Sequence, residues 1–137
     1  MGKRDHTREA EALFQRFAER HDLSYIIEAA PIEVCWTFPE QSKLSLPVTL
    51  CLQSGDELNF GVADFWSYFF PFQDVAEEFE CILNAWVRGE ARVAILGPVA
   101  RVLQVRDEGR WKSVYHANRL LPIWRPPIRT IRNHPSS

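Results

Sequence analysis

Three segments between residues 32 and 62 alternate apolar with polar residues, and short turns separate them. Successive side chains of a strand point to opposite faces, so each segment would have one apolar side. Turns of a few residues, at 39–42 and 54–56, join antiparallel neighbours. We therefore expect three antiparallel strands that share one buried face, the middle one lying at an edge or bulged at Pro47, which has no amide hydrogen to donate. The apolar positions are Ile32, Val34, Trp36 and Phe38, then Leu44, Leu46, Val48, Leu50 and Leu52, then Leu58, Phe60 and Val62.

Two other segments, Thr7–His21 and 74–88, repeat apolar residues at the spacing of one helix face. Asp74 and Glu77 are spaced as a capping box at the start of the second helix, and Gly89 stands where a left-handed C-cap belongs. Each helix has a single apolar side, so we expect both to pack on the same face of the sheet. The apolar positions are Ala10, Leu13, Phe14, Phe17 and Ala18, then Val75, Phe79, Ile82, Leu83, Trp86 and Val87.

The rest of the chain predicts strands at 92–96, 99–106 and 111–117, the last two joined by a hairpin loop. Apolar residues lie on both sides of the middle strand, which indicates cover on both faces. The whole order predicts an α+β fold: a mostly antiparallel sheet of five to six strands with two helices packed on one face, either a two-layer sandwich or a half-barrel roll. We expect residues 1–121 to form one domain and residues 122–137 to form a Pro- and Arg-rich tail that packs on it or extends from it.

The net charge of −2 hides an uneven distribution. All 18 acidic residues lie before Gly109, together with 10 of the 16 basic ones. The segment from Gly109 onward is therefore a cationic stretch on an acidic body. Either it folds back over that body, or it forms an edge that binds phosphate or acidic groups. The overall charge makes nucleic acid an unlikely partner, because general nucleic-acid binding needs a clearly basic domain.

Several classes of protein do not fit the sequence. The charged N-terminal residues do not resemble a secretory signal, and no apolar run is long enough to span a membrane. Three scattered cysteines without a C-x-x-C pair favour a reducing, cytoplasmic location. Neither a cofactor motif nor a pair of neighbouring metal ligands occurs, so we expect no cofactor and no metal; His6 also lies too near the terminus to be held firmly. The scattered residues are His6, His21, His116, His134, Cys35, Cys51 and Cys81.

His116 is the one histidine on a predicted strand of the body, and it has two interpretations. Imidazole titrates near neutrality, so His116 with a partner such as Asp64 could act in general acid–base catalysis. Alternatively it is a half-exposed strand residue with no chemical role. We favour this second interpretation and assign no catalytic residue.

Residues 65–72 are unusually aromatic. As a strand they would place Phe65, Ser67 and Phe69 on one side and Trp66, Tyr68 and Phe70 on the other. One core cannot receive both sets, and soluble monomers rarely expose several large aromatic side chains together. The second set either wraps into the core on the way to the second helix or forms a binding surface.

Two functions remain open. The first is a non-catalytic interaction or accessory protein, in which Trp66, Tyr68 and Phe70 contact a protein partner or a second copy of the chain, with the basic tail (Arg119 and Arg125) as a second contact. The second is a small-ligand-binding or small-enzyme roll. Its pocket would lie between the sheet and the helices, lined by Trp36, Trp66 and Tyr68, with Asp64 or His116 as its polar groups. The absence of a clustered acid–base set favours the first function.

Overall fold

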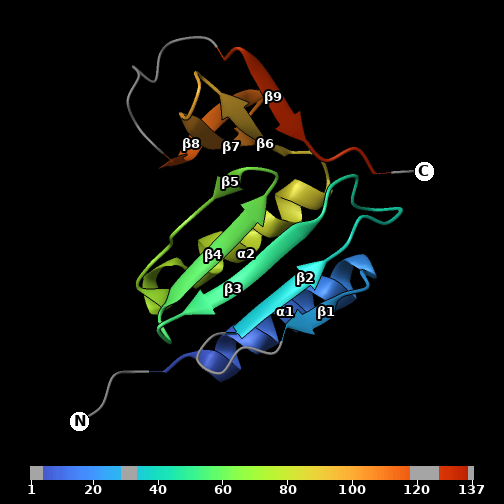
Figure 1. The fold of residues 1–137 in the computed structure, drawn as a ribbon, viewed down its shortest axis with the longest axis vertical. Coiled ribbons are helices and arrows are strands. Elements are labelled where there is room, and N and C mark those ends of the chain that lie inside the picture. The colour runs from blue at the N-terminus through green and yellow to red at the C-terminus, as the bar shows by residue number, and fades with distance from the viewer. Residues whose placement is uncertain (1–4, 29–33, 118–126, 136–137) are drawn as a thin grey trace.

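The computed structural model describes residues 5–28, 34–117 and 127–135. It confirms the α+β class, with two helices and two antiparallel sheets (Figure 1). In chain order the elements are α1 (Thr7–His21), β1 (Ile26–Glu28), β2 (Val34–Phe38), β3 (Val48–Gln53), β4 (Glu57–Val62), β5 (Phe65–Trp66), α2 (Phe72–Val87), β6 (Ala91–Ile95), β7 (Arg101–Asp107), β8 (Arg110–Ala117) and β9 (Arg129–Arg132).

The first sheet has five strands in the order β1-β2-β3-β4-β5, each antiparallel to its neighbour. Leu50 pairs with Trp36 on one side and with Phe60 on the other, and all three side chains are buried. Directly opposite residues share a face, so this register confirms the single apolar face expected from the alternation. The expectation that this strand lies at an edge or is bulged is wrong, because β3 is the middle strand and pairs without a register shift on both sides. Pro47, which has no amide hydrogen to donate, lies just before the strand, which begins at Val48.

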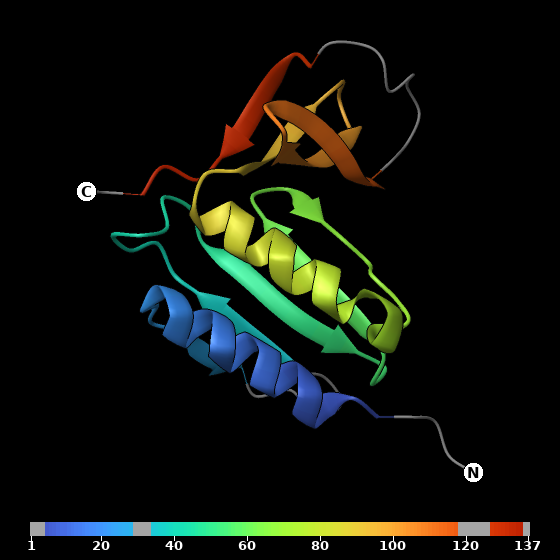
Figure 2. The same cartoon turned by 180° about the vertical axis from the view of Figure 1, so that it is seen from behind.

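Both helices cover this apolar face (Figure 2), as predicted from their single apolar stripes. The buried residues of α1 are Ala10, Leu13, Phe14, Phe17 and Ala18. The guanidinium of Arg16 donates to both carboxylate oxygens of Glu80, at 2.9 and 3.1 Å, and this pair joins the exposed sides of α1 and α2. The opposite face of the sheet carries neither helix.

The two ends of α2 test the predicted caps. The helix begins at Phe72, and the predicted capping box of Asp74 and Glu77 is wrong, because the carboxylate of Asp56 from the β3–β4 turn accepts the Phe72 amide hydrogen at 2.9 Å. The C-terminal end is as predicted. Gly89 has φ +74°, and its N–H donates to the Trp86 carbonyl at 3.0 Å. The Glu90 N–H reaches the Ala85 carbonyl at 2.8 Å, which completes a Schellman motif.

The C-terminal strands form a second sheet instead of extending the first. Its order is β8-β7-β6-β9, all antiparallel. The helix α2 separates β5 from β6, so β6 starts a new sheet beyond the end of the first (Figure 1). One of its faces joins the main core through Val93 and Leu103, and the other buries Ala94 and Val102 in a cluster of their own. This explains the apolar residues on both sides of the 99–106 segment.

β9 was not expected, since its sequence shows no clear period. It forms because Arg129–Arg132 pairs antiparallel with β6. The residue after it, Asn133, is 1% exposed. Its amide nitrogen donates to the carbonyls of Lys43 and Val87, each at 2.9 Å, and its amide oxygen accepts the Ser45 N–H at 2.8 Å. This one side chain ties the C-terminal segment to the β2–β3 connection and to the end of α2.

Within the described residues, neither helix has the length and apolar composition needed to cross a membrane.

Candidate functional site

The aromatic segment divides between core and surface, in the alternation expected from the sequence. Phe65, Ser67 and Phe69 are buried, at 2%, 0% and 8% exposure. Tyr68 and Phe70 are exposed, at 49% and 63%. The cause is the pairing with β4, in which Val62 faces Phe65 and Leu58 faces Phe69, and every second side chain therefore points away from the helices. We call Trp66, Tyr68 and Phe70 the aromatic edge.

Trp66 is half-buried and lies directly opposite Gly61, its partner on the neighbouring strand β4. A Cβ atom at position 61 would come within 2.6 Å of two carbons of the Trp66 indole. The ring therefore lies flat on the backbone of β4, and glycine is the residue that leaves room for it. Trp66 is held by its own sheet, whereas Tyr68 and Phe70 project from the same face.

The Gly61–Trp66 contact predicts a coupling between the two positions. Gly61→Ala should lower the free energy of unfolding by about 1–3 kcal/mol, the range for an overpacked site. In a Trp66→Ala background the same change should cost nothing or stabilise the strand, because Ala favours a strand more than Gly does. Urea unfolding of the four proteins measures this coupling. Equal effects of Gly61→Ala in both backgrounds would contradict the contact.

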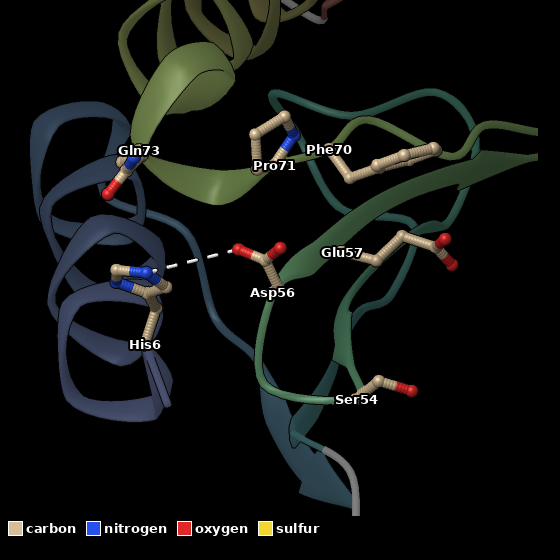
Figure 3. A pocket seen from close by; sticks show the side chains of 7 residues that line it. All are labelled: His6, Ser54, Asp56, Glu57, Phe70, Pro71 and Gln73. Carbon is tan, nitrogen blue, oxygen red and sulfur yellow. Dashed lines mark ion pairs between the residues drawn. The ribbon is translucent and has the colours of Figure 1, made fainter. Parts of the chain in front are cut away.

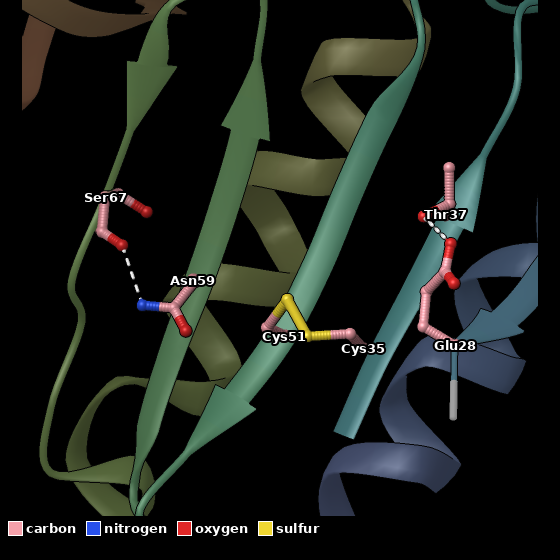
Figure 4. The surroundings of a disulfide bond; sticks show 6 residues. All are labelled: Glu28, Cys35, Thr37, Cys51, Asn59 and Ser67. Carbon is pink, nitrogen blue, oxygen red and sulfur yellow. Dashed lines mark hydrogen bonds between the residues drawn. A yellow bond between two sulfur atoms is a disulfide. The ribbon is translucent and has the colours of Figure 1, made fainter. Parts of the chain in front are cut away.

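The strand register puts a disulfide on the same face of the sheet as the aromatic edge. Figure 4 shows this disulfide and its neighbours. Cys35 and Cys51 are directly opposite each other on β2 and β3, and their sulfur atoms are bonded. The expectation of three unpaired cysteines is therefore wrong. Spacing in the sequence could not show the pair, since only the strand register brings residues 35 and 51 together. Beside them, the Asn59 amide nitrogen donates to the Ser67 carbonyl at 3.0 Å.

Cysteine accessibility gives a direct check of this pairing. In folded protein without reductant, iodoacetamide is expected to modify Cys81 alone, because Cys81 is exposed and Cys35 and Cys51 are bonded. After reduction in denaturant, all three cysteines of the chain should react. Intact mass spectrometry counts the adducts. More than one adduct on the folded, unreduced protein would contradict the disulfide.

Asp64 does not stand free as a base. Its two oxygens accept hydrogen bonds from the Arg101 guanidinium at 3.2 and 2.8 Å. These bonds hold the pKa of the Asp64 carboxyl below its ordinary value. Arg101 is 9% exposed and also donates to the carbonyls of Gly97 and Ala100, so the pair joins the β4–β5 turn to the start of β7.

His116 is not brought to Asp64. It pairs with Val102, whose neighbour Arg101 points to the other face of the second sheet. The expected pocket of Trp36, Trp66 and Tyr68 does not form either. Trp36, 3% exposed, lies on the helix-covered face, stacked on Tyr25 at 4.4 Å, whereas the aromatic edge lies on the opposite face. Arg119 and Arg125 fall outside the described residues.

A cleft of about 390 Å³ adjoins the aromatic edge at Phe70 (Figure 3). It lies where the β3–β4 turn meets the N-terminal ends of both helices. Apolar Phe70 and Pro71 form one side, and polar side chains form the other. The lining residues are His6, Ser54, Asp56, Glu57, Phe70, Pro71 and Gln73.

His6 is the residue of this cleft that sequence reasoning set aside. It is 7% exposed, and its ring stacks on Phe72 with centroids 4.7 Å apart. Its Nδ1 lies 2.8 Å from Glu9 Oε2, and its Nε2 lies 3.9 Å from Asp56 Oδ1. The His6 backbone N–H also donates to the Gly55 carbonyl at 2.8 Å. A position near the terminus suggested a loose residue, but the local contact with Glu9 and the long-range contacts with Gly55, Asp56 and Phe72 hold it in place.

The cleft therefore combines an exposed aromatic ring with carboxylates from Asp56 and Glu57. Such a combination suits a cationic side chain, since the ring face and the carboxylates both attract positive charge. Within the described ranges, no group of three or more His, Cys, Asp or Glu side chains is placed to hold a metal ion. Comparison with protein-family models, curated proteins and solved structures finds no match to this chain.

Proposed function

We propose that this protein is a non-catalytic interaction protein that binds a protein partner through the aromatic edge and the adjoining cleft. One observation carries the proposal: Tyr68 and Phe70 are 49% and 63% exposed, while Ser67 and Phe69, which alternate with them, are buried. The backbone between them is held to β4 by the hydrogen bonds of Phe69 with Leu58, both at 2.8 Å. Exposed aromatic side chains bury a large area on contact, as residues at the centre of binding interfaces do.

The cleft supports a partner of particular chemistry. A Lys or Arg side chain suits it, because the carboxylates of Asp56 and Glu57 and the Phe70 ring, which line the cleft, all attract positive charge. The partner segment would thus lay apolar side chains against Tyr68 and Phe70 and insert a basic residue beside Asp56. Such a contact is partly electrostatic, so raising the salt concentration should weaken it.

The partner could also be a second copy of the chain, and one observation favours this. Asp74, Glu77 and Glu78 are exposed on α2, whereas Arg129 and Arg132 are exposed on β9. An acidic and a basic surface on one chain can pair reciprocally across a twofold axis. In that case the wild type sediments as a dimer in low salt and as a monomer in high salt.

The alternative function, a small-ligand-binding or small-enzyme domain, is favoured by the cleft itself, with His6 between Glu9 and Asp56 as its polar group. A ligand that such a site holds would remain in protein purified under mild conditions. Native mass spectrometry of protein from its own host reports a retained small molecule, a second copy and a bound protein in one experiment.

The test of the interaction proposal is the double variant Tyr68→Ser/Phe70→Ser. It should retain the wild-type unfolding temperature, because both side chains are exposed, and lose the partner seen with the wild type. The matched control is Ile26→Ser/Ile27→Ser on the opposite edge strand β1, where both residues are also exposed. The control should keep the partner. Equal binding by the wild type and the Tyr68/Phe70 variant would contradict the proposal.

The scattered cysteines of the sequence favour a cytoplasmic location, and we keep this location in the proposal. The Cys35–Cys51 disulfide favours another location, because stable disulfides belong to oxidising compartments. Alkylating thiols in intact host cells before lysis decides between the two. Alkylated Cys35 and Cys51 would support the cytoplasm, and a protected pair would contradict it.

A further inference from the structure

Three arginines surround one tryptophan on the second sheet, away from the aromatic edge. Arg92 on β6 lies directly opposite Arg132 on β9, and Arg106 on β7 lies opposite Trp111 on β8. Arg92 is also paired with Gln104, two residues before Arg106, so all of these side chains share one face. The other face packs on the main core through Val93, Leu103 and Ile131.

The guanidinium groups gather on the indole ring of Trp111. Their central carbons lie 4.3 Å (Arg92), 5.1 Å (Arg106) and 5.5 Å (Arg132) from its centroid. The electron-rich ring face attracts each cation, and a guanidinium stacked on a ring keeps its edge N–H groups free for other acceptors. Arg92 uses its Nε–H for Gln104 Oε1, at 2.7 Å, which fixes the orientation of its fork.

The positive charge of this cluster has no ion-pair partner among the described residues. In the part of the chain that the structure describes, the ion pairs join other residues, and none includes Arg92, Arg106 or Arg132. Arg92 and Arg132 lie directly opposite each other on neighbouring strands. Like charges in this arrangement repel each other and destabilise the sheet. Burial, together with repulsion from Arg132 and Arg106, lowers the pKa of Arg92 from its ordinary value. An anion bound between the three groups would remove this repulsion.

We infer that Arg92, Arg106 and Arg132, held by Trp111, form a binding site for a phosphate group. A terminal phosphate carries nearly two negative charges and three acceptor oxygens, which match three guanidinium groups. A carboxylate carries one charge and would leave the cluster strongly positive. An extended nucleic-acid backbone would also contact the acidic part of the chain and be repelled by it, because all 18 acidic residues lie before Gly109. The occupant is therefore a phosphate monoester or diphosphate, on a small molecule or on a phosphorylated side chain.

The experiment is a titration of the full chain with inorganic pyrophosphate, with ADP and with a phosphoserine peptide, followed by calorimetry. At least one of these ligands should bind, and the most avid one identifies the source of the phosphate. The variant Arg106→Gln/Arg132→Gln, which changes two exposed residues, should weaken binding about tenfold or more. The control Arg8→Gln/Arg20→Gln removes the same charge from exposed positions of α1 and should bind like the wild type.

A second readout does not depend on any variant. The side-chain Nε–H signals of Arg92, Arg106 and Arg132 and the indole N–H signal of Trp111 should shift in NMR spectra of the wild type as the ligand is added. The inference is overturned if none of the three ligands binds, if binding leaves these signals unmoved, or if both double variants bind like the wild type. Binding of single-stranded DNA without binding of any of the three ligands would also overturn it.

Discussion

Replacing Trp86 by Ala is expected to lower the free energy of unfolding by about 3–5 kcal/mol, the range for deleting a buried aromatic side chain. Trp86 is 0% exposed on α2 and meets Phe60 of β4 edge to face, with ring centroids 5.5 Å apart. Its removal leaves a cavity between the helix and the middle of the first sheet, and a helix and a sheet cannot close together without losing other contacts. Phe79→Ala, at another fully buried position of the same stripe, should fall in the same range.

The control for Trp86→Ala is Glu78→Ala, an exposed position on the same helix, where a change within about 0.5 kcal/mol is expected. Urea unfolding followed by circular dichroism measures all three variants. A loss of less than about 1 kcal/mol for Trp86→Ala would mean that the assignment of the buried face of α2 is wrong.

Asn133→Ala should produce the second large effect, a loss of about 1–3 kcal/mol, although the residue lies only four positions from the end of the chain. The cost arises because the substitution leaves the Ser45 N–H and the carbonyls of Lys43 and Val87 without the side chain that pairs with them. The second sheet would also lose one of its ties to the first, so β9 should exchange its amide hydrogens faster.

His134→Ala is the matched control, because His134 is the next residue and is exposed. Its backbone N–H, which donates to Ser45 Oγ at 2.9 Å, remains in the variant. Unfolding curves and hydrogen exchange should show His134→Ala close to the wild type. If Asn133→Ala were equally harmless, the C-terminal segment would not be anchored as the structure has it.

Local patterns predicted the elements well. The helix Thr7–His21 has the predicted bounds, and the Gly89 cap forms where a positive φ was needed. The alternation of residues 65–70 correctly separated the buried side chains from Tyr68 and Phe70. Each of these features depends on neighbours within a few positions in the chain, and helical or strand periodicity records such neighbours directly.

Features that depend on long-range register were missed. The division into two sheets, the pairing of Cys35 with Cys51 and the placement of His6 against Asp56 each join residues far apart in sequence. The same is true of Arg92 and Arg132, which only the β6–β9 pairing brings together. The sequence showed that the C-terminal segment is cationic. Of the three arginines of the proposed phosphate site, however, Arg92 and Arg106 come before Gly109, and only Arg132 belongs to that segment.

We propose that Phe70 faces a protein partner in the cell. The most direct measurement is to place a photo-crosslinking phenylalanine analogue at position 70 in the natural host, and at position 25, where Tyr25 is 37% exposed on the inner side of the sheet, as the control. We expect an irradiation-dependent protein adduct from position 70 and not from position 25. Its mass would be twice the chain mass for a second copy and another mass for a different partner. Irradiation that yields no adduct from position 70, or the same adducts from both positions, would contradict the proposal.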